Sequence, residues 1–260
     1  MLKAQGIVKS YPSAEDKRKY VRVVSDVSVT LENNCTTVIV GESGSGKSTL
    51  ARILSYIENP DEGTVYLNET CISSAGRKEK KALRGNVQLV MQDSYSSLDP
   101  QKTIGMILDE PLRFICRMPK AERKKRIDEL IKMVQLDNDV LKRRPAELSG
   151  GQQKRVCVAR AIASSPQHII FDESFSGLDV TVKKQILSLL RDLRKNLGLS
   201  FLIITHDLDT AMFMADVIHV MRNGQIVETV KAPQSLSDFK APYSKELVKA
   251  VLYKRQSLQL

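Results

Sequence analysis

The chain has 260 residues, of which 42% are hydrophobic and 27% are charged, and its formal net charge at pH 7 is +10. This length and composition are typical of one large globular α/β domain or two small ones, with a substantial core. No apolar stretch approaches the ~18 residues that span a bilayer, and the first residues lack the apolar block of a signal peptide, so we expect a cytosolic protein.

Basic residues cluster at positions 77–81, 120–126 and 142–144. On charge alone, nucleic acid, anionic lipid headgroups and nucleotides are all acceptable partners. Acidic residues interrupt two of these clusters, and no aromatic residues accompany them as a stacking platform. We therefore interpret the clusters as solvated helix faces.

The cysteines Cys35, Cys71, Cys116 and Cys157 lie far apart and form no C-x-x-C pair. This spacing indicates reduced thiols and not a metal site or a disulfide framework. Cys157 falls in an apolar helical stretch, where we expect it to belong to the core.

The first third of the chain predicts mainly strands. A polar, charged loop at 13–20 separates the first strand from the second, and a turn is expected at 60–63. The expected strands cover residues 2–9, 21–31, 38–40, 64–67 and 87–91. The strand at 38–40 leads into a glycine-rich turn, which a helix follows to about residue 56.

That glycine-rich turn carries the pattern G-x-x-x-x-G-K-[ST], the phosphate-binding P-loop, between a strand and a helix as the motif requires. Its glycines allow consecutive backbone N–H groups to point at phosphate oxygens, and the helix adds the positive end of its dipole. Lys47 can reach the β- and γ-phosphates, and Ser48 can bind magnesium. The expected phosphate-binding residues are Gly41, Glu42, Ser43, Gly44, Ser45, Gly46, Lys47, Ser48 and Thr49.

Residues 103–163 change character, because strands are absent until His168. The spacing of Ile127, Leu130, Ile131 and Val134 follows the helical period, and apolar residues over 104–112 predict another helix. The stretch ends at Leu148-Ser149-Gly150-Gly151-Gln152, where Ser149 is expected to cap a helix over 151–163.

The last third returns to strand–helix alternation, which predicts a mainly parallel sheet with right-handed crossovers. Arg222-Asn223-Gly224 is a turn of the hairpin type between two strands. The expected strands cover 168–171, 199–205, 217–221 and 225–230. The expected helices cover 181–195, 208–215 and 244–252. We therefore predict a core over about 1–92 and 164–230, with a helical subdomain at about 93–163 inserted into it and a short C-terminal helix.

The strand at 168–171 ends in two carboxylates, Asp172 and Glu173. Asp172 is suited to hold magnesium. Glu173 follows the carboxyl end of the strand, where ligands bind in open α/β sheets, and there it could polarise an attacking water as general base. Taken alone, the two residues could also belong to a strand that simply enters a loop.

The turn at 148–152 is a second glycine-bearing helix N-terminus suited to a phosphate. Two such sites in one chain cannot both grip one γ-phosphate from the same side. The economical arrangement is a head-to-tail dimer, in which ATP lies between the P-loop of one subunit and the 148–152 turn of the other.

Together these motifs resemble the ATP-binding cassette (ABC) ATPases, and the resemblance covers essentially the whole chain. It implies one α/β domain over 1–260, a P-loop NTPase core with a mainly parallel sheet, an N-terminal antiparallel β part and an inserted helical subdomain. It also implies ATP and Mg²⁺ as cofactors and ATP hydrolysis as the activity.

The resemblance implies a role for each motif. The expected catalytic residues are Glu173, His206 and the Q-loop residue Gln92. Of these, His206 is expected to pair with the γ-phosphate. The expected magnesium ligands are Ser48, Gln92 and Asp172. The expected nucleotide contacts beyond the P-loop are Tyr11 on adenine, Ser149, Gly151 and Gln152 of the signature, and Asp179 of the D-loop. Each single residue has a plainer alternative: Tyr11 could be a turn aromatic, His206 a structural histidine and Gln92 a strand-end polar residue.

Two residues depart from the family pattern. Ser174 stands where the family often has Pro, and Gly177 where it often has Ala or Ser. Neither departure removes a catalytic group. We expect both to loosen the segment between Glu173 and Asp179.

One cassette without a membrane span looks like a separate ATPase subunit of a bacterial importer. The stretches 95–100 and 241–245 and the charged 13–20 loop are similar to those of oligopeptide, dipeptide and nickel importer ATPases. No cysteine follows Cys157, so we expect no iron–sulfur centre.

The implied partners are two membrane permease subunits, a second ATPase subunit that is identical or different, and, indirectly, an extracytoplasmic solute-binding protein. The implied location is the cytoplasmic face of the membrane, and the cargo is a peptide, nickel or a metal chelate. A soluble ABC ATPase acting on nucleic acid or ribosomes is the alternative, which the net charge of +10 supports, and an exporter subunit is another. We expect no nucleic acid partner, because neither a second cassette nor a long coiled-coil insertion is present.

Overall fold

The structure is a computed structural model, which describes residues 1–76, 79–80, 83, 85–92 and 97–257. The chain divides into two compact units, a first unit of residues 1–76 and 201–260 and a second unit of residues 77–200. Among the described helices, none combines the length and the apolar character that crossing a membrane requires.

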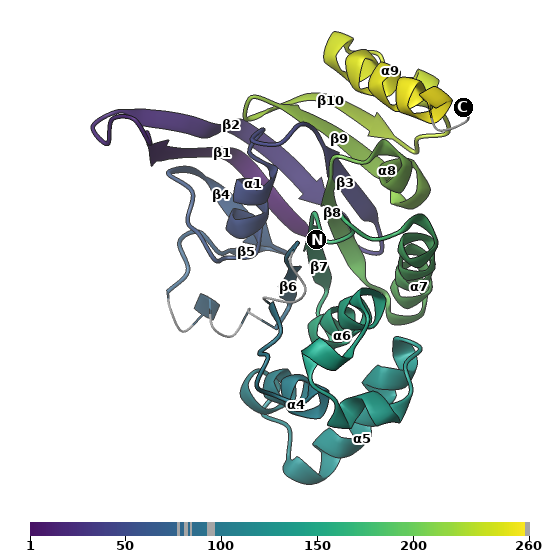
Figure 1. The fold of residues 1–260 in the computed structure, drawn as a ribbon. Coiled ribbons are helices and arrows are strands. Elements are labelled where there is room, and N and C mark those ends of the chain that lie inside the picture. Colours follow the sequence, from purple (N-terminus) through teal and green to yellow (C-terminus); the bar gives the residue numbers. More distant parts are fainter. Residues whose placement is uncertain (77–78, 81–82, 84, 93–96, 258–260) are drawn as a thin grey trace. The chain divides into compact units, whose positions relative to one another are not determined.

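The first unit contains an antiparallel sheet in the order β2-β1-β4-β5 (Figure 1). Its strands are β1 (Leu2–Pro12), β2 (Tyr20–Leu31), β4 (Glu62–Leu67) and β5 (Thr70–Cys71). The predicted N-terminal antiparallel part is thereby confirmed. β5 was not predicted, because a strand of two residues is too short to show alternation.

The first unit also contains four neighbouring strands in the order β10-β9-β3-β8. They are β3 (Thr36–Val40), β8 (Ser200–Thr205), β9 (Val217–Arg222) and β10 (Gln225–Lys231). β3 pairs in parallel with both β8 and β9, while β9 and β10 form the predicted antiparallel hairpin. Every residue of β3 is buried, which explains its short β-branched run.

Three α-helices belong to the first unit among its described residues: α1 (Lys47–Leu54), α8 (Leu208–Met214) and α9 (Pro242–Ser257). A short 3₁₀ helix, η3 (Leu236–Asp238), precedes α9. α9 is longer than predicted at both ends and starts at a proline, a residue whose fixed φ suits the first helical position. In Figure 1, α9 lies beside the β9–β10 hairpin.

In the second unit, β6 (Val87–Val90) pairs in parallel with β7 (His168–Asp172). Its described α-helices are α4 (Ile104–Phe114), α5 (Lys120–Met133), α6 (Gly150–Ile162) and α7 (Val180–Leu197), with the 3₁₀ helices η1 (Asn138–Lys142) and η2 (Pro145–Glu147). Cys157 is buried on α6, as predicted. The unit includes the helical stretch together with β6, β7 and α7, so the predicted subdomain limits at about 93 and 163 stay a prediction.

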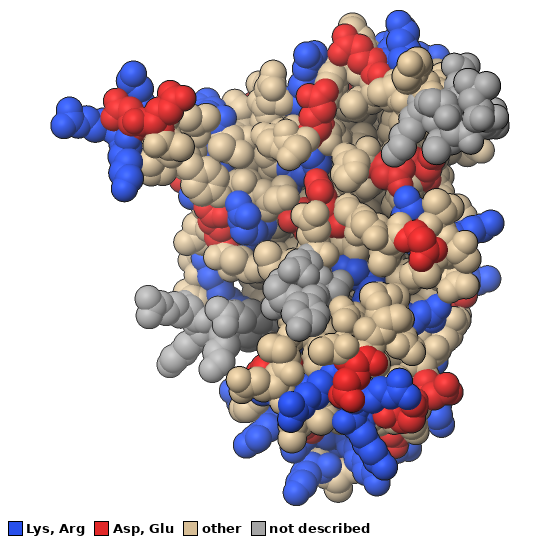
Figure 2. Space-filling view, viewed as in Figure 1, with Lys and Arg blue, Asp and Glu red and all other residues tan. Residues whose placement is uncertain are grey.

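The basic cluster at 120–126 lies on α5, in the lower region of Figure 2 where red side chains are interspersed among blue ones. Arg123 Nε lies 2.6 Å from Asp109, and Arg126 Nη1 lies 3.1 Å from Glu129. This cluster is therefore a solvated helix face, as predicted. Most of the cluster at 77–81 lies outside the described residues.

Candidate nucleotide-binding and catalytic site

The P-loop joins β3 to α1 as the sequence predicts. Gly46, the residue before α1, has a φ of +100°, and a Cβ there would lie 2.4 Å from the carbonyl oxygen of Val23. Only glycine fits this close approach with this backbone. Gly46 contributes no side-chain cap to α1, and the N-terminal end of this helix turns the positive end of its dipole toward the loop.

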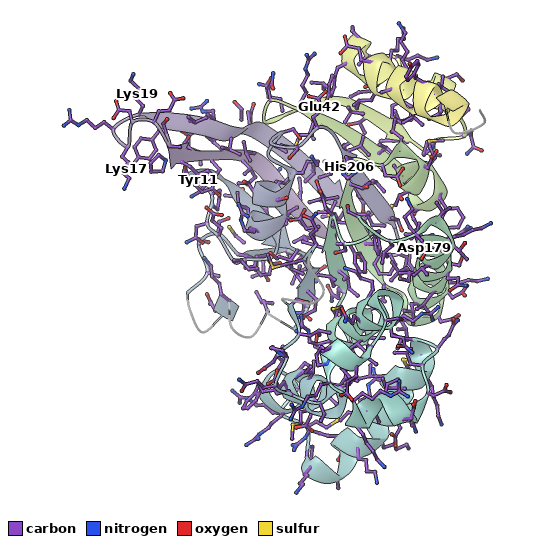
Figure 3. All side chains as sticks on the ribbon, viewed as in Figure 1. Tyr11, Lys17, Lys19, Glu42, Asp179 and His206 are labelled. Atoms are coloured by element: carbon purple, nitrogen blue, oxygen red, sulfur yellow. The ribbon has the colours of Figure 1, made fainter. Side chains whose placement is uncertain are left out.

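Lys47 is folded back over the loop and is only 3% exposed. Its Nζ donates to the carbonyl oxygens of Gly41 at 2.9 Å and Glu42 at 2.6 Å, and to Ser45 Oγ at 3.3 Å. The loop thus encloses its own ammonium group, with Glu42 exposed at the surface (Figure 3). A phosphate that enters would replace these oxygens as the partner of Lys47.

His206 follows β8 directly, and Gly41 follows β3. Val40 and Thr205 are paired in the parallel register, so His206 and the P-loop start at the same edge of these strands. β8 is entirely buried, whereas His206 is exposed (Figure 3). The structure therefore brings His206 to the P-loop edge.

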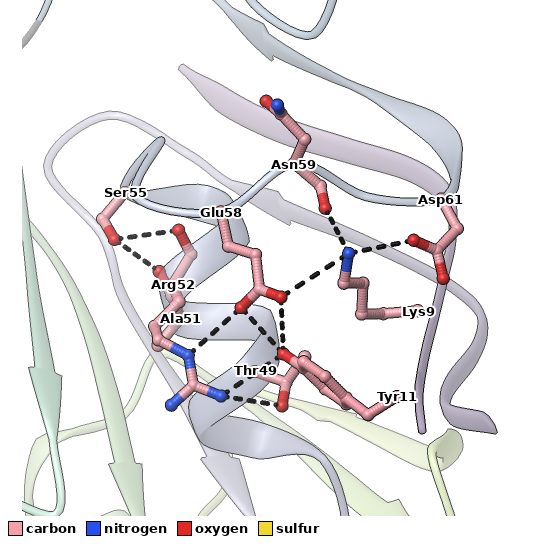
Figure 4. Close-up of polar contacts among 9 residues, drawn as sticks. All are labelled: Lys9, Tyr11, Thr49, Ala51, Arg52, Ser55, Glu58, Asn59 and Asp61. Carbon is pink, nitrogen blue, oxygen red and sulfur yellow. Dashed lines mark hydrogen bonds and ion pairs between the residues drawn. The ribbon is translucent and has the colours of Figure 1, made fainter. Parts of the chain in front are cut away.

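Tyr11 lies at the end of β1 in a cluster of charged side chains that the sequence did not predict (Figure 4). Its hydroxyl group lies 2.7 Å from both carboxylate oxygens of Glu58. Arg52 Nη2 donates to the Tyr11 hydroxyl at 3.4 Å and to Thr49 Oγ1 at 3.3 Å, while Lys9 Nζ lies 5.7 Å from the ring centroid. Tyr11 is thereby connected to Thr49, the last predicted phosphate-binding residue.

Burial disfavours the charged form of Glu58, but hydrogen bonds from Tyr11 and Arg52 outweigh it and hold the pKa of this carboxyl below its ordinary value. Lys9 Nζ, 3.5 Å from Glu58 and 2.9 Å from Asp61, adds to the same effect. The cluster keeps a charged acceptor under the tyrosine hydroxyl at neutral pH.

In the second unit, Val90 of β6 pairs with Phe171 of β7. Both strands run in the same direction, so Gln92, Asp172 and Glu173 follow at one edge of the pair. The predicted Q-loop glutamine and the two predicted carboxylates are thus neighbours. Residues 93–96 lie outside the described part of the chain, so the stretch at 95–100 stays only partly tested.

Glu173 has a φ of +45°, in the left-handed region that non-glycine residues rarely adopt. Such backbone costs of order 1 kcal/mol or more and is common at active sites. The next residue, Ser174, is fully buried, and its hydroxyl donates to the carbonyl oxygen of Val90 at 2.6 Å. The expectation that Ser174 loosens the segment is therefore wrong, because its side chain ties the segment to β6.

Ser149 and Gln152 cap α6 reciprocally, as the sequence predicts for Ser149. Ser149 Oγ accepts from the Gln152 N–H at 3.3 Å, and Gln152 Oε1 accepts from the Ser149 N–H at 3.0 Å. A Cβ on Gly151 would lie 2.9 Å from Val182 on α7, so glycine lets the two helices approach. Ser149 and Gly150 are exposed.

Asp179 has a structural role that the sequence did not predict. It caps α7, because its side chain accepts from the Val182 N–H at 2.9 Å. Gly177, two residues earlier, has a φ of +75° and would meet nothing within 4 Å if it had a Cβ.

Lys154 on α6 is another residue missed by sequence reasoning. It is only 2% exposed, and its Nζ donates to the carbonyl oxygen of Gln92 at 3.4 Å. A lysine on an otherwise apolar helix face was the available signal. This contact connects the helix of the signature turn to the Q-loop backbone.

The predicted site residues thus fall into two sets, one in each unit. The first unit holds Tyr11, His206 and the P-loop residues 41–49. The second unit holds Gln92, Ser149, Gly151, Gln152, Asp172, Glu173 and Asp179.

Residues 24–176 match the family model described as ABC transporter. The chain is 40% identical over 236 residues to the nickel import ATP-binding protein NikE of Escherichia coli (strain K12), which covers 91% of this chain and 88% of that protein. The NikE protein of Shigella boydii serotype 4 matches to the same extent. The chain belongs to the ABC transporter family.

Solved structures of ABC proteins have the same fold. The ABC transporter cassette MJ0796, solved as a dimer, superposes with a TM-score of 0.79 and 30% identity, over 90% of this chain and 100% of that one. CbiO1 from Clostridium perfringens, described as part of the complex cbiONQ, superposes with a TM-score of 0.77 and 26% identity, over 89% and 88% of the two chains.

Family membership confirms the predicted fold class, an α/β ABC cassette with an antiparallel N-terminal sheet and parallel strands beside it. It also confirms the enzyme class: this ABC protein is an ATPase, and ATP is its nucleotide. The roles of the single residues, the magnesium ion, the cargo and the assembly stay predictions.

Proposed function

We propose that the chain is the ATP-hydrolysing subunit of an importer of the nickel or peptide type. The observation that carries this proposal is the 40% identity over 91% of the chain with NikE of Escherichia coli, a nickel import ATP-binding protein. The CbiO1 match supports an assembly with other transporter components. Nickel, free or chelated, is the cargo that we favour, and a short peptide is the alternative.

In this proposal the P-loop binds the phosphates of ATP. Lys47 exchanges the carbonyl oxygens of Gly41 and Glu42 for phosphate oxygens, and the N-terminal end of α1 adds the positive end of its dipole. The ring of Tyr11 stacks on adenine while Glu58 and Arg52 hold its hydroxyl group.

The proposed magnesium ligands are Ser48, Gln92 and Asp172. A hydroxyl, an amide oxygen and a carboxylate are the hard oxygen donors that Mg²⁺ prefers, and the β6–β7 register sets Gln92 and Asp172 at one edge, so these residues fit the ion. The ion would neutralise charge on the phosphates.

Glu173 is the proposed general base, which takes a proton from the attacking water. His206 is proposed to donate a hydrogen bond to the γ-phosphate, because an exposed imidazole at the P-loop edge can reach it. The strained backbone of Glu173 supports this assignment, since strain of this kind is common where a catalytic side chain is held in place.

The proposed active form is a head-to-tail dimer with an identical or different ATPase subunit. Ser149, Gly151 and Gln152 of one subunit would meet the nucleotide held by the other, and the exposure of Ser149 and Gly150 leaves this turn open to a partner. The dimeric MJ0796 structure supports such an assembly. We propose that two permease subunits hold the dimer at the cytoplasmic face of the membrane, beneath an extracytoplasmic solute-binding protein.

Substitution Glu173→Gln tests the catalytic part of the proposal. The variant should bind ATP as tightly as the wild type, lower the hydrolysis rate by about 100-fold or more, and accumulate as an ATP-bound dimer in size-exclusion chromatography. Glu69→Gln, on an exposed turn, is the matched control and should keep the wild-type rate. Unchanged turnover in Glu173→Gln would refute Glu173 as the base.

Uptake measurements test the cargo. Cells that express the chain with its neighbouring permease genes should accumulate radioactive nickel, and expression of Glu173→Gln should abolish that uptake. Uptake of labelled dipeptide without nickel uptake would assign the peptide alternative. Recovery of RNA with the purified protein, without permease, would support the competing soluble ATPase.

A further inference from the structure

The Pro-Tyr segment at residues 241–245 resembles a feature of peptide and nickel importer ATPases, but the proposed reaction gives it no role. The structure buries Tyr243 in the first turn of α9, where it is only 4% exposed. Burial of a tyrosine favours a hydrogen-bond partner for its hydroxyl group.

That partner belongs to the P-loop. The Tyr243 hydroxyl oxygen accepts from the backbone N–H of Glu42 at 3.2 Å. The guanidinium of Arg222 lies over the Tyr243 ring at 4.5 Å from its centroid, which is a cation–π contact. The tyrosine is thus held between the end of β9 and the loop that binds phosphate.

The start of α9 is itself fixed to the hairpin. Glu228 Oε1 on β10 accepts from the N–H groups of Lys240 at 2.6 Å and Ala241 at 3.1 Å. These two residues immediately precede Pro242 and Tyr243. The tyrosine therefore cannot shift without breaking contacts to a charged acceptor, which are among the stronger hydrogen bonds in proteins.

The same hairpin supports the P-loop at two further points. A Cβ on Gly41 would lie 2.1 Å from the carbonyl oxygen of Met221, so the loop starts in direct contact with β9. Near the other end of the loop, the Gly224 N–H donates to the carbonyl oxygen of Ser45 at 3.0 Å. The Tyr243 contact adds a third point, between these two in the sequence.

We propose that Tyr243 is a positioning residue that holds the P-loop backbone in its phosphate-binding form. Phosphate binding by the loop requires that several N–H groups point inward together, and ordering them before ATP arrives raises affinity. The contact also makes α9 sensitive to nucleotide, because any coupling between two parts of a protein acts in both directions. The inference rests on the proposed role of the P-loop in binding ATP.

Substitution Tyr243→Phe removes one oxygen atom and keeps the ring on Arg222. Because one hydrogen bond is lost, the dissociation constants for ATP and ADP should both rise by about threefold to tenfold. KM for ATP should rise in proportion while kcat stays within twofold, since the contact is the same in the ground and transition states. Tyr253→Phe, on an exposed tyrosine of the same helix, is the matched control and should change neither value.

The proposal is overturned if Tyr243→Phe binds both nucleotides within twofold of the wild-type affinity and only its melting temperature is lower. That result would mean that Tyr243 has a packing role. Lys47→Ala separates this failure from that of the proposed function. If Lys47→Ala binds ATP as the wild type does, the P-loop assignment itself is wrong. If Lys47→Ala loses binding and Tyr243→Phe does not, only the positioning role is wrong.

Hydrogen exchange tests the proposal on the wild-type protein, so it does not depend on whether a variant folds. Saturating ATP should slow amide exchange at Glu42 and over the first turns of α9, residues 242–249. Residues 250–257 of the same helix are the internal reference. Identical exchange of 242–249 with and without ATP would contradict the coupling.

Discussion

His219 on β9 makes the stability of the first unit depend on pH in a way that can be calculated. Its side chain is 8% exposed, and its Nδ1 lies 2.8 Å from Thr229 Oγ1 on the neighbouring strand β10. Burial disfavours the imidazolium and lowers the pKa of His219 from 6.5 to about 4. The native protein therefore keeps this histidine neutral at pH values where the unfolded chain has already bound a proton.

The direction in which stability changes with pH follows from the number of protons that each state binds. Between pH 6.5 and pH 4 the unfolded state binds more protons than the native state, so the free energy of unfolding falls as pH falls. This lowering of the pKa from 6.5 to about 4 corresponds to about 3 kcal/mol well below pH 4, of which about 2 kcal/mol is already lost at pH 5. Above pH 6.5 this contribution is fully present and constant.

The variant His219→Gln keeps a polar group for Thr229 but does not titrate. We expect the variant to be less stable than the wild type at pH 8, with the deficit shrinking by about 2 kcal/mol on going to pH 5. Urea unfolding of both proteins at pH 8, 7, 6 and 5 measures the difference between their free energies of unfolding. The contributions of the other titrating groups are the same in both proteins and cancel in this difference. A difference that stays constant within about 0.5 kcal/mol over this range refutes the reasoning.

Two further changes test the site. Ser149→Ala removes the reciprocal cap of α6 and should lower the free energy of unfolding by about 1 kcal/mol. Ser149→Thr keeps a hydroxyl group and should lose less than half of that free energy. Equal stability of the wild type and both variants in urea would contradict the role of Ser149 as a cap. Tyr11→Ala removes the ring proposed to stack on adenine and should weaken ATP binding by about tenfold. Tyr11→Phe keeps the ring and loses only the hydroxyl contacts with Glu58 and Arg52, so it should weaken binding by less than about threefold. Wild-type affinity of Tyr11→Ala in a calorimetric titration would exclude stacking.

Local patterns predicted most of the elements of this fold. Periodicity and turn chemistry were sufficient to predict the P-loop, the cap at Ser149 and the apolar strands, because each of these patterns lies within a short stretch of sequence. The limits of elements were less well predicted, and α9 continues through Ser257, beyond the predicted end at 252. Its last turns lack a strong stop signal such as glycine.

Contacts between distant residues could not be predicted from local patterns. Glu58 and Tyr11 are 47 positions apart, and Glu42 and Tyr243 are 201 apart, so nothing near either residue reveals its partner. The structure also changed the interpretation of Ser174. The absence of the family's proline suggested freedom, but a buried hydroxyl group bonded to Val90 restores order by another means.

The P-loop and the strand before it depend on residues that come about 180 to 200 positions later in the chain, and this has a consequence for synthesis on the ribosome. The Thr36 N–H is bonded to Asp216 Oδ2, 180 positions later, and Glu42 is bonded to Tyr243. At about 5–20 residues per second, roughly 10 to 35 seconds pass between the emergence of Thr36 and that of Asp216.

Until residue 200 has emerged, β3 has neither of the parallel neighbours with which it pairs, because β8 and β9 are still unmade. The second unit, residues 77–200, is continuous in sequence and is complete before them. A nascent chain stopped after residue 200 therefore exposes an unpaired strand, all of whose residues are buried in the finished protein, next to the future nucleotide site. An unpaired strand of this kind is prone to aggregation until its neighbours have been made.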